Sequence, residues 1–252
     1  MDYDPTMVAE YFDRDPSTEW ARLGDDVQGR IRHAVHRSAI DIALDACDTD
    51  EPFVLDVGAG PGRFAIDVIR RGGRVVVTDV SEGQLAEAER RIGEAGLLEG
   101  VSEFAVRDVL DLSAYEDASF DVVLCLGGPV SYVRDAHPRA LGELLRVTRS
   151  RLVVSVMGLY GSLRLVGPLD AASELLELDA HFPVDEILGG ARVVNTRPSA
   201  GWHLPMALFT SQGLCRAIER AGGRVLEMRA ANPLVPEFLG VPAIADSPDA
   251  ET

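Results

Sequence analysis

The stretch Val54–Phe64 reads VLDVGAGPGRF, an apolar run that passes into a segment of three glycines and one proline. This order is typical of a buried strand that enters a tight turn and then a helix, and glycines leave backbone amides open to a ligand that a Cβ would shield. The G-x-G-x-G spacing, with Pro61 inside it, differs from the G-x-G-x-x-G that holds a dinucleotide pyrophosphate. The motif alone is also compatible with a plain strand-to-helix connection, so the residues around it decide its meaning.

Two acidic residues follow at the ends of the next two expected strands. Asp79 lies 21 positions after Gly58, where a carboxylate can accept hydrogen bonds from two ribose hydroxyls. Asp108 ends the third run, where it can accept a hydrogen bond from an adenine amino group, with Val80 and Val109 on the two faces of the ring. Either aspartate alone is compatible with a solvated loop residue. The two together, in this order, favour an adenosine ligand.

Short β-branched runs alternate with helical patterns from about residue 51 to residue 157. This rhythm predicts an α/β fold, with a parallel sheet covered by helices on both faces. A helix with Ser81 as its N-cap is expected to follow the second strand. The expected strands are Phe53–Val57, Arg74–Asp79, Ser102–Val106, Phe120–Leu124, Arg151–Met157 and Arg224–Arg229, and the expected helices are Arg63–Arg71, Glu82–Gly93, Arg139–Arg149 and Ser211–Ala221.

The stretch Leu55–Val133 resembles the class I S-adenosylmethionine-dependent methyltransferases, particularly the members that act on small molecules. The resemblance implies a Rossmann-like sheet with S-adenosylmethionine as cofactor, and it places Leu124–Tyr132 where such enzymes meet their acceptor. The cofactor-binding residues that it implies are Asp56 towards the amino-acid end, Gly58, Ala59 and Gly60 along the methionine, Asp79 at the ribose, Val80, Asp108 and Val109 at the adenine, and Leu126 under the sulfonium.

We interpret the chain as a single methyltransferase domain, residues 1–252. Its expected parts are an N-terminal helical arm or lid (1–50), a cofactor-binding core (51–157), an acceptor cap (158–207), the end of the core (208–232) and a tail (233–252). The family's core usually has seven strands. Three explanations remain for the seventh: it is missing, it lies beyond this sequence, or Arg192–Thr196 fills part of that edge. This open point concerns the sheet edge and a possible homodimer.

Charge and composition limit the partners. The net charge of −17 and the pI near 4.6 repel phosphate backbones, so we expect a small-molecule acceptor and no nucleic acid. The segment after the fourth strand also lacks the Asp/Asn-Pro-Pro-aromatic motif of DNA amino-methylating relatives. We see no apolar run of about 18 residues, so we expect no membrane span and a cytoplasmic protein. The three cysteines share no metal-type spacing with the histidines, and no metal is predicted.

The catalytic groups are less clearly indicated. A methyl sulfonium is already activated, so in-line positioning in a dry pocket supplies most of the acceleration and a base is optional. His203 is the candidate general base for a hydroxyl acceptor, and Tyr132 is a candidate donor or pocket wall, although packing roles fit both. Cys125 is a possible nucleophile, but packing is the favoured interpretation. Arg30 can pair with the methionine carboxylate if the arm closes.

Two functions remain open at this level. The first is methyl transfer to oxygen, nitrogen or carbon of a small molecule by in-line displacement. The second is a protein of the same fold that binds S-adenosylmethionine or S-adenosylhomocysteine in a cyclisation or regulatory role. Labelled methyl appearing in a product distinguishes them. A nicotinamide-dependent dehydrogenase is disfavoured because the glycine spacing is wrong for a pyrophosphate.

Overall fold

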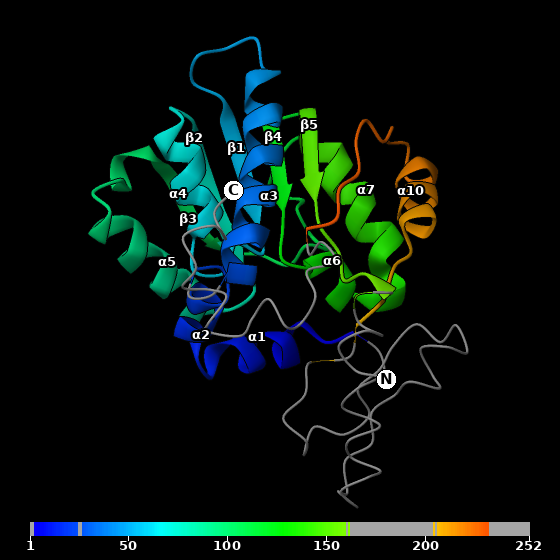
Figure 1. Cartoon of the computed structure of the whole chain (residues 1–252), viewed down its shortest axis with the longest axis horizontal. Helices are drawn as coiled ribbons and strands as arrows, with labels where there is room; N and C mark the ends of the chain where they lie inside the picture. The colour runs from blue at the N-terminus through cyan, green and yellow to red at the C-terminus, as the bar shows by residue number, and fades with distance from the viewer. Residues whose placement is uncertain (1–2, 25–26, 160, 162–203, 205, 232–252) are drawn as a thin grey trace, which may run out of the picture.

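The computed structural model describes residues 3–24, 27–159, 161, 204 and 206–231. Within these residues, five parallel strands form one sheet in the order β3-β2-β1-β4-β5 (Figure 1). The strand order reverses between β1 and β4. Open α/β sheets bind ligands in the crevice beyond the carboxyl ends of the strands at such a reversal, so we expect the ligand there. The strands are β1 (Phe53–Val57), β2 (Arg74–Asp79), β3 (Val101–Val106), β4 (Phe120–Cys125) and β5 (Thr148–Val154).

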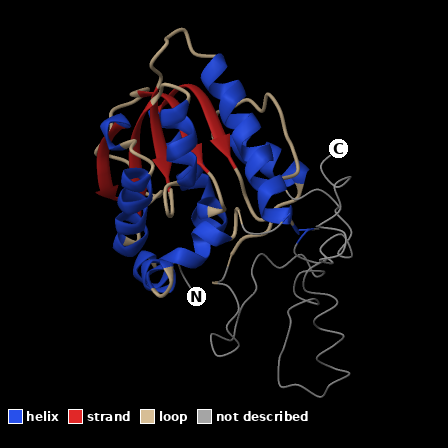
Figure 2. Cartoon of the chain, turned by 60° about the vertical axis from the view of Figure 1, so that its left-hand side comes forward, coloured by secondary structure: helices blue, strands red, loops and turns tan. Residues whose placement is uncertain are grey.

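Helices cover both faces of the sheet (Figure 2). Because successive strand residues point to opposite faces, Val54 and Leu124 pack against α3, α4 and α5, while Leu55 and Val123 pack against α7 and α10. The described helices are α1 (Pro5–Asp13), α2 (Pro16–Ala21), α3 (Val27–Asp45), α4 (Arg63–Arg70), α5 (Glu82–Glu94), α6 (Pro129–Tyr132), α7 (His137–Val147) and α10 (Ser211–Arg220), with the short 3₁₀ turns η1 (Leu98–Gly100) and η2 (Arg134–Ala136).

The predicted core elements are confirmed, with small shifts at their ends. The N-cap of α5 is Ser81, whose hydroxyl accepts a hydrogen bond from the Gln84 amide at 2.9 Å. The largest shifts concern β5, which begins and ends three residues earlier than expected, and α7, which begins and ends two residues earlier than expected. Pro138 fits the first helical turn, and the chain from Thr148 onwards already pairs with β4 as strand β5.

The prediction of a sixth strand over Arg224–Arg229 is wrong for the described part of the chain. In residues 206–231 this stretch joins no ladder, and the side chains of Leu226 and Met228 are exposed. Arg229 instead donates a hydrogen bond to the Ser38 hydroxyl on α3. The alternating pattern was compatible with a strand, but a strand also needs a neighbouring backbone at hydrogen-bonding distance, which the pattern does not report.

The predicted N-terminal helices are present. Helices α1 and α2 lie at the carboxyl ends of the strands, while α3 packs on a face of the sheet (Figure 1). The Asp4 carboxylate caps α1 by accepting a hydrogen bond from the Thr6 amide at 2.9 Å. None of the helices in the described ranges is both long and apolar enough to cross a membrane.

Candidate active site

The glycine-rich turn after β1 has the backbone geometry that only glycine adopts readily. Gly58, Gly60 and Gly62 have φ angles of 66°, 54° and 78°, all in the left-handed region. A Cβ on Gly58 would lie 2.4 Å from Cγ of Pro129, at the start of α6. The turn therefore packs directly against the segment after β4, and a larger residue would push the two apart.

Asp79 holds this turn in place from the end of β2. Its two carboxylate oxygens accept hydrogen bonds from the Gly60 amide and the Ser81 amide, each at 2.9 Å. The side chain is buried, and this burial raises the pKa of Asp79 to about 6 despite the two amide hydrogen bonds. Each oxygen keeps a further lone pair, so the carboxylate can still accept hydrogen bonds from a ligand.

Asp56, on β1, is almost fully buried, at 1% exposure. Neither of its oxygens makes a hydrogen bond of normal geometry to any described residue. Burial, followed by the nearby Asp79 carboxylate, raises the pKa of Asp56 to about 7. The Ala65 backbone amide lowers this pKa only in part. A buried acid whose oxygens make no hydrogen bond of normal geometry is costly, so this site is suited to a ligand or water that supplies donors or positive charge.

Asp108 lies beyond the end of β3, where its carboxylate accepts a hydrogen bond from the Leu110 amide at 2.9 Å. The hydroxyl of Tyr3, from the segment before α1, also hydrogen-bonds this carboxylate. Burial of the ring, together with the Asp108 charge, raises the pKa of Tyr3. In this structure a tyrosine hydroxyl thus occupies a donor position that the sequence assigns to an adenine amino group.

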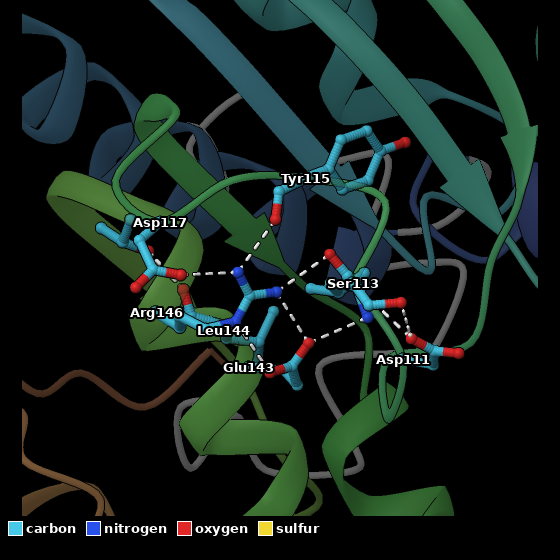
Figure 3. A network of polar contacts seen from close by, with 9 residues as sticks. Asp111, Ser113, Tyr115, Asp117, Glu143, Leu144 and Arg146 are labelled. Carbon is cyan, nitrogen blue, oxygen red and sulfur yellow. Dashed lines mark hydrogen bonds and ion pairs between the residues drawn. The ribbon is translucent and has the colours of Figure 1, made fainter.

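The loop that follows Asp108 is fixed by Arg146 of α7 (Figure 3). The guanidinium donates hydrogen bonds to the carbonyl oxygens of Leu112 and Tyr115, each at 2.9 Å, and pairs with Asp117 and Glu143. These bonds tie the β3–β4 connection to a core helix, so Asp108 projects from a fixed loop.

The predicted cofactor residues gather at one cavity of about 1230 Å³, which continues along β5 towards residues 224–231. Asp56 and Asp108 are not among its lining residues. The predicted residues that line the cavity are Gly58, Ala59, Gly60, Asp79, Val80, Val109 and Leu126.

The predicted acceptor side lies next to this wall. Tyr132 is buried at 7% exposure, lines the cavity and packs edge-to-face on Phe12, and burial raises the pKa of its hydroxyl. His203 lies outside the described residues. Cys125 is fully buried within β4, and burial raises the pKa of its thiol, which disfavours a thiolate nucleophile.

The N-terminal arm supplies contacts that sequence reasoning missed. The Asp13 carboxylate accepts hydrogen bonds from the Ser81 hydroxyl and the Gly83 amide, and the Gln84 side chain donates to the Phe12 carbonyl. These partners are 68 to 72 positions apart, so no local pattern could have paired them. The aromatic residues of the arm were the one sequence signal that the arm packs against the rest of the domain.

The arginine of α3 that lines the cavity is not the one that the sequence indicated. Arg30, the predicted partner of the methionine carboxylate, is exposed on α3. Arg32, one half-turn further along the same helix, lines the cavity instead. Neighbouring positions on a helix point about 100° apart, and the sequence does not show which of them faces the ligand.

A cavity beyond the carboxyl ends of β1 and β4, a glycine-rich turn and acids after successive strands are together typical of nucleoside-binding proteins with a Rossmann-like sheet. A family model described as a methyltransferase domain matches residues 54–151. The chain is 30% identical over 156 residues to the magnesium-protoporphyrin O-methyltransferase of Rhodobacter capsulatus, covering 59% of this chain and 67% of that one. It is 37% identical over 158 residues to the demethylmenaquinone methyltransferase of Thermobifida fusca, covering 61% and 62%.

A solved structure shares the fold. The magnesium protoporphyrin IX methyltransferase of Synechocystis PCC 6803, with bound S-adenosylhomocysteine, has a TM-score of 0.61 at 19% identity and covers 89% of this chain and 91% of that one. The chain belongs to the class I S-adenosylmethionine-dependent methyltransferases. It is an enzyme of that class, with S-adenosylmethionine as its cofactor.

Proposed function

We propose that the cavity binds S-adenosylmethionine in the orientation that the resemblance implies, and that the enzyme methylates a small, partly apolar molecule. The observation that carries the cofactor assignment is the pair of buried carboxylates. Asp79 faces the cavity with spare lone pairs, and Asp56 has no hydrogen bond of normal geometry from the described residues. Ribose hydroxyls suit the first, and the ammonium end of the methionine, directly or through water, suits the second.

The remaining cofactor contacts follow from this orientation. The backbone of Gly58–Gly60, which carries no bulky side chain, lies along the methionine. Asp108 and Val109 lie at the adenine, and Leu126 lies under the sulfonium. The bound cofactor supplies a methyl group activated by that sulfonium. The protein then has to orient the acceptor in line with the methyl group and exclude water, which the arm and the buried β4–α6 segment support.

The acceptor proposal rests on the surroundings of Tyr132. The cluster around this residue is apolar and includes Val8, Leu204 and Met206, with Phe12 and Met157 packed against it. The named relatives act on magnesium-protoporphyrin and on demethylmenaquinone. We infer an acceptor that presents apolar surface to this cluster, with the Tyr132 hydroxyl as an orienting group. His203 stays a prediction for a base.

Methyl-labelled S-adenosylmethionine tests this function. The protein is incubated with a metabolite extract, bulk tRNA and DNA in separate reactions, and products that gain one methyl group are identified by mass spectrometry. Label in a small molecule is expected. Faster labelling of tRNA or DNA contradicts the small-molecule proposal, and cofactor binding without label in any product favours the cyclisation or regulatory alternative. The homodimer stays a prediction, which light scattering on the purified protein tests.

A further inference from the structure

Three arginines line one part of the cavity, although the chain carries a net charge of −17. Arg22 follows α2, Arg32 comes from α3, and Arg63 begins α4. Positive charge inside a cavity of an acidic protein favours anionic ligand groups and costs desolvation when no such group is present. The three side chains have different roles.

Arg32 and Arg63 fix the backbone at the end of α2. Arg32 donates a hydrogen bond to the carbonyl oxygen of Arg22 at 2.9 Å, and Arg63 donates to the carbonyl of Trp20 at 2.7 Å. The Arg63 guanidinium also lies over the Trp20 ring, 3.8 Å from its centroid. Guanidinium groups at the carbonyl end of a helix are electrostatically favourable, so the backbone from Trp20 to Arg22 is held in a defined position.

The Arg22 side chain reaches the acceptor side of the cavity. Its Nη2 would lie 3.5 Å from a Cβ on Gly127, the second residue after β4. Its charge also acts on the buried Tyr132 hydroxyl, whose pKa it lowers against the larger, opposite effect of burial. Arg22 therefore lies where the methionine end of the cofactor and the acceptor are both expected.

Arg22 has hydrogen-bonding capacity that the described residues do not use. Its guanidinium pairs with Glu19 at 2.8 Å, while its Nε is buried and makes no hydrogen bond to any described residue. A guanidinium presents its donors as a planar fork that matches the two oxygens of a carboxylate. A carboxylate that enters from the cavity would satisfy the buried Nε and share the charge with Glu19.

We propose that Arg22 is the binding residue for a carboxylate in this cavity. This inference rests on the proposed cofactor and acceptor site and deepens it. The carboxylate can come from the methionine end of the cofactor or from an acidic acceptor, because Arg22 lies beside both regions. Arg32 and Arg63 act through Arg22, as positioning residues.

The test compares Arg22→Met with Arg37→Met, which removes an exposed arginine on α3. Calorimetry measures the affinity for S-adenosylhomocysteine and for 5′-methylthioadenosine, which has the adenosine and the sulfur but no carboxylate. If the methionine carboxylate is the ligand, Arg22→Met weakens S-adenosylhomocysteine binding at least about tenfold and leaves methylthioadenosine binding unchanged. Arg22→Lys should recover part of the loss, because a single charge remains without the fork.

An acidic acceptor gives a different result. With saturating S-adenosylhomocysteine, wild-type protein should then bind benzoate in preference to benzamide, and only Arg22→Met should lose that preference. The inference is overturned if Arg22→Met matches Arg37→Met for both nucleosides and wild type shows no preference for benzoate, with circular dichroism confirming that both variants are folded. Failure of wild type to bind either nucleoside would instead overturn the cofactor assignment.

Discussion

The two walls of the cavity are encoded in different ways. The wall formed by the glycine turn and the ends of β1, β2 and β3 comes from residues 54–109, and its acids follow one another in chain order. The wall formed by the arm reaches the same place through contacts between residues about 70 positions apart, such as Asp13 with Gly83. The first wall holds buried charges and the second covers them. Substitutions in the first should therefore change affinity by more than substitutions in the second.

Asp79→Ala should show the largest effect. It removes two proposed ribose hydrogen bonds to a charged acceptor, each worth roughly 1.5–3 kcal/mol, so S-adenosylhomocysteine affinity should fall at least about a hundredfold. Asp79 also accepts hydrogen bonds from the Gly60 and Ser81 amides, and the variant loses both, so its melting temperature should fall as well. Calorimetry measures the affinity, and circular dichroism confirms the fold. Unchanged affinity would show that the ribose is bound elsewhere.

Gly58→Ala tests the contact between the turn and α6, and Gly96→Ala is its matched control. Both glycines have left-handed φ angles, 66° and 70°, so each alanine costs on the order of 1–3 kcal/mol of backbone strain. The new Cβ at position 58 overlaps Pro129, whereas a Cβ at position 96 has no atom within 4 Å. Both variants should have a lower melting temperature, but only Gly58→Ala should lose affinity for S-adenosylhomocysteine, by more than about tenfold. Equal affinities in the two variants would argue against a cofactor role for the turn.

Acidification should weaken cofactor binding. The pKa of Asp79 is raised to about 6 and that of Asp56 to about 7, and the proposed ligand donates to their charged forms. Affinity should fall as the pH drops from about 7.5 to about 5.5, by up to roughly tenfold per pH unit for each group. Calorimetry across this pH range measures the affinity, and Asp56→Asn should make the affinity depend less on pH. A constant affinity would contradict the orientation proposed for the ligand.

The same pKa values predict the opposite trend for the ligand-free protein. Both folded-state values lie above the ordinary 3.8 of an aspartate, so the two groups favour folding most when they are protonated. Their contribution to the free energy of unfolding is lost as the pH rises through about 6 and 7. The ligand-induced rise in melting temperature should therefore shrink on acidification, while these two groups stabilise the ligand-free protein.

The difference between the walls also explains what could be predicted from the sequence. The strand VLDV, the glycines and the spacing to Asp79 are local signals. They indicated the sheet correctly, and most of the residues predicted from them line the cavity, while their contacts with the cofactor stay predictions. The prediction of a strand over Arg224–Arg229 was wrong because an apolar run does not show whether a neighbouring strand is available for pairing. Arg32 and Asp13 were missed because their roles depend on how helices far apart in the chain meet.

Asp13→Ala should have the smallest effect and should act on the arm alone. The exposed Asp13 carboxylate accepts hydrogen bonds from Ser81 and the Gly83 amide at the start of α5, where a negative charge is favourable. For an exposed group, such contacts contribute about 1 kcal/mol or less, so affinity for S-adenosylhomocysteine should fall no more than about fivefold.

Because Asp13 is proposed to close the arm and not to touch the ligand, the loss should come from faster release. Stopped-flow displacement of S-adenosylhomocysteine measures the dissociation rate, and Glu10→Ala on the exposed side of α1 removes an equal charge as the control. An unchanged dissociation rate with slower association would show that Asp13 steers the ligand by charge. A loss as large as that of Asp79→Ala would show that the arm belongs to the binding wall itself, and the distinction between the two walls would no longer hold.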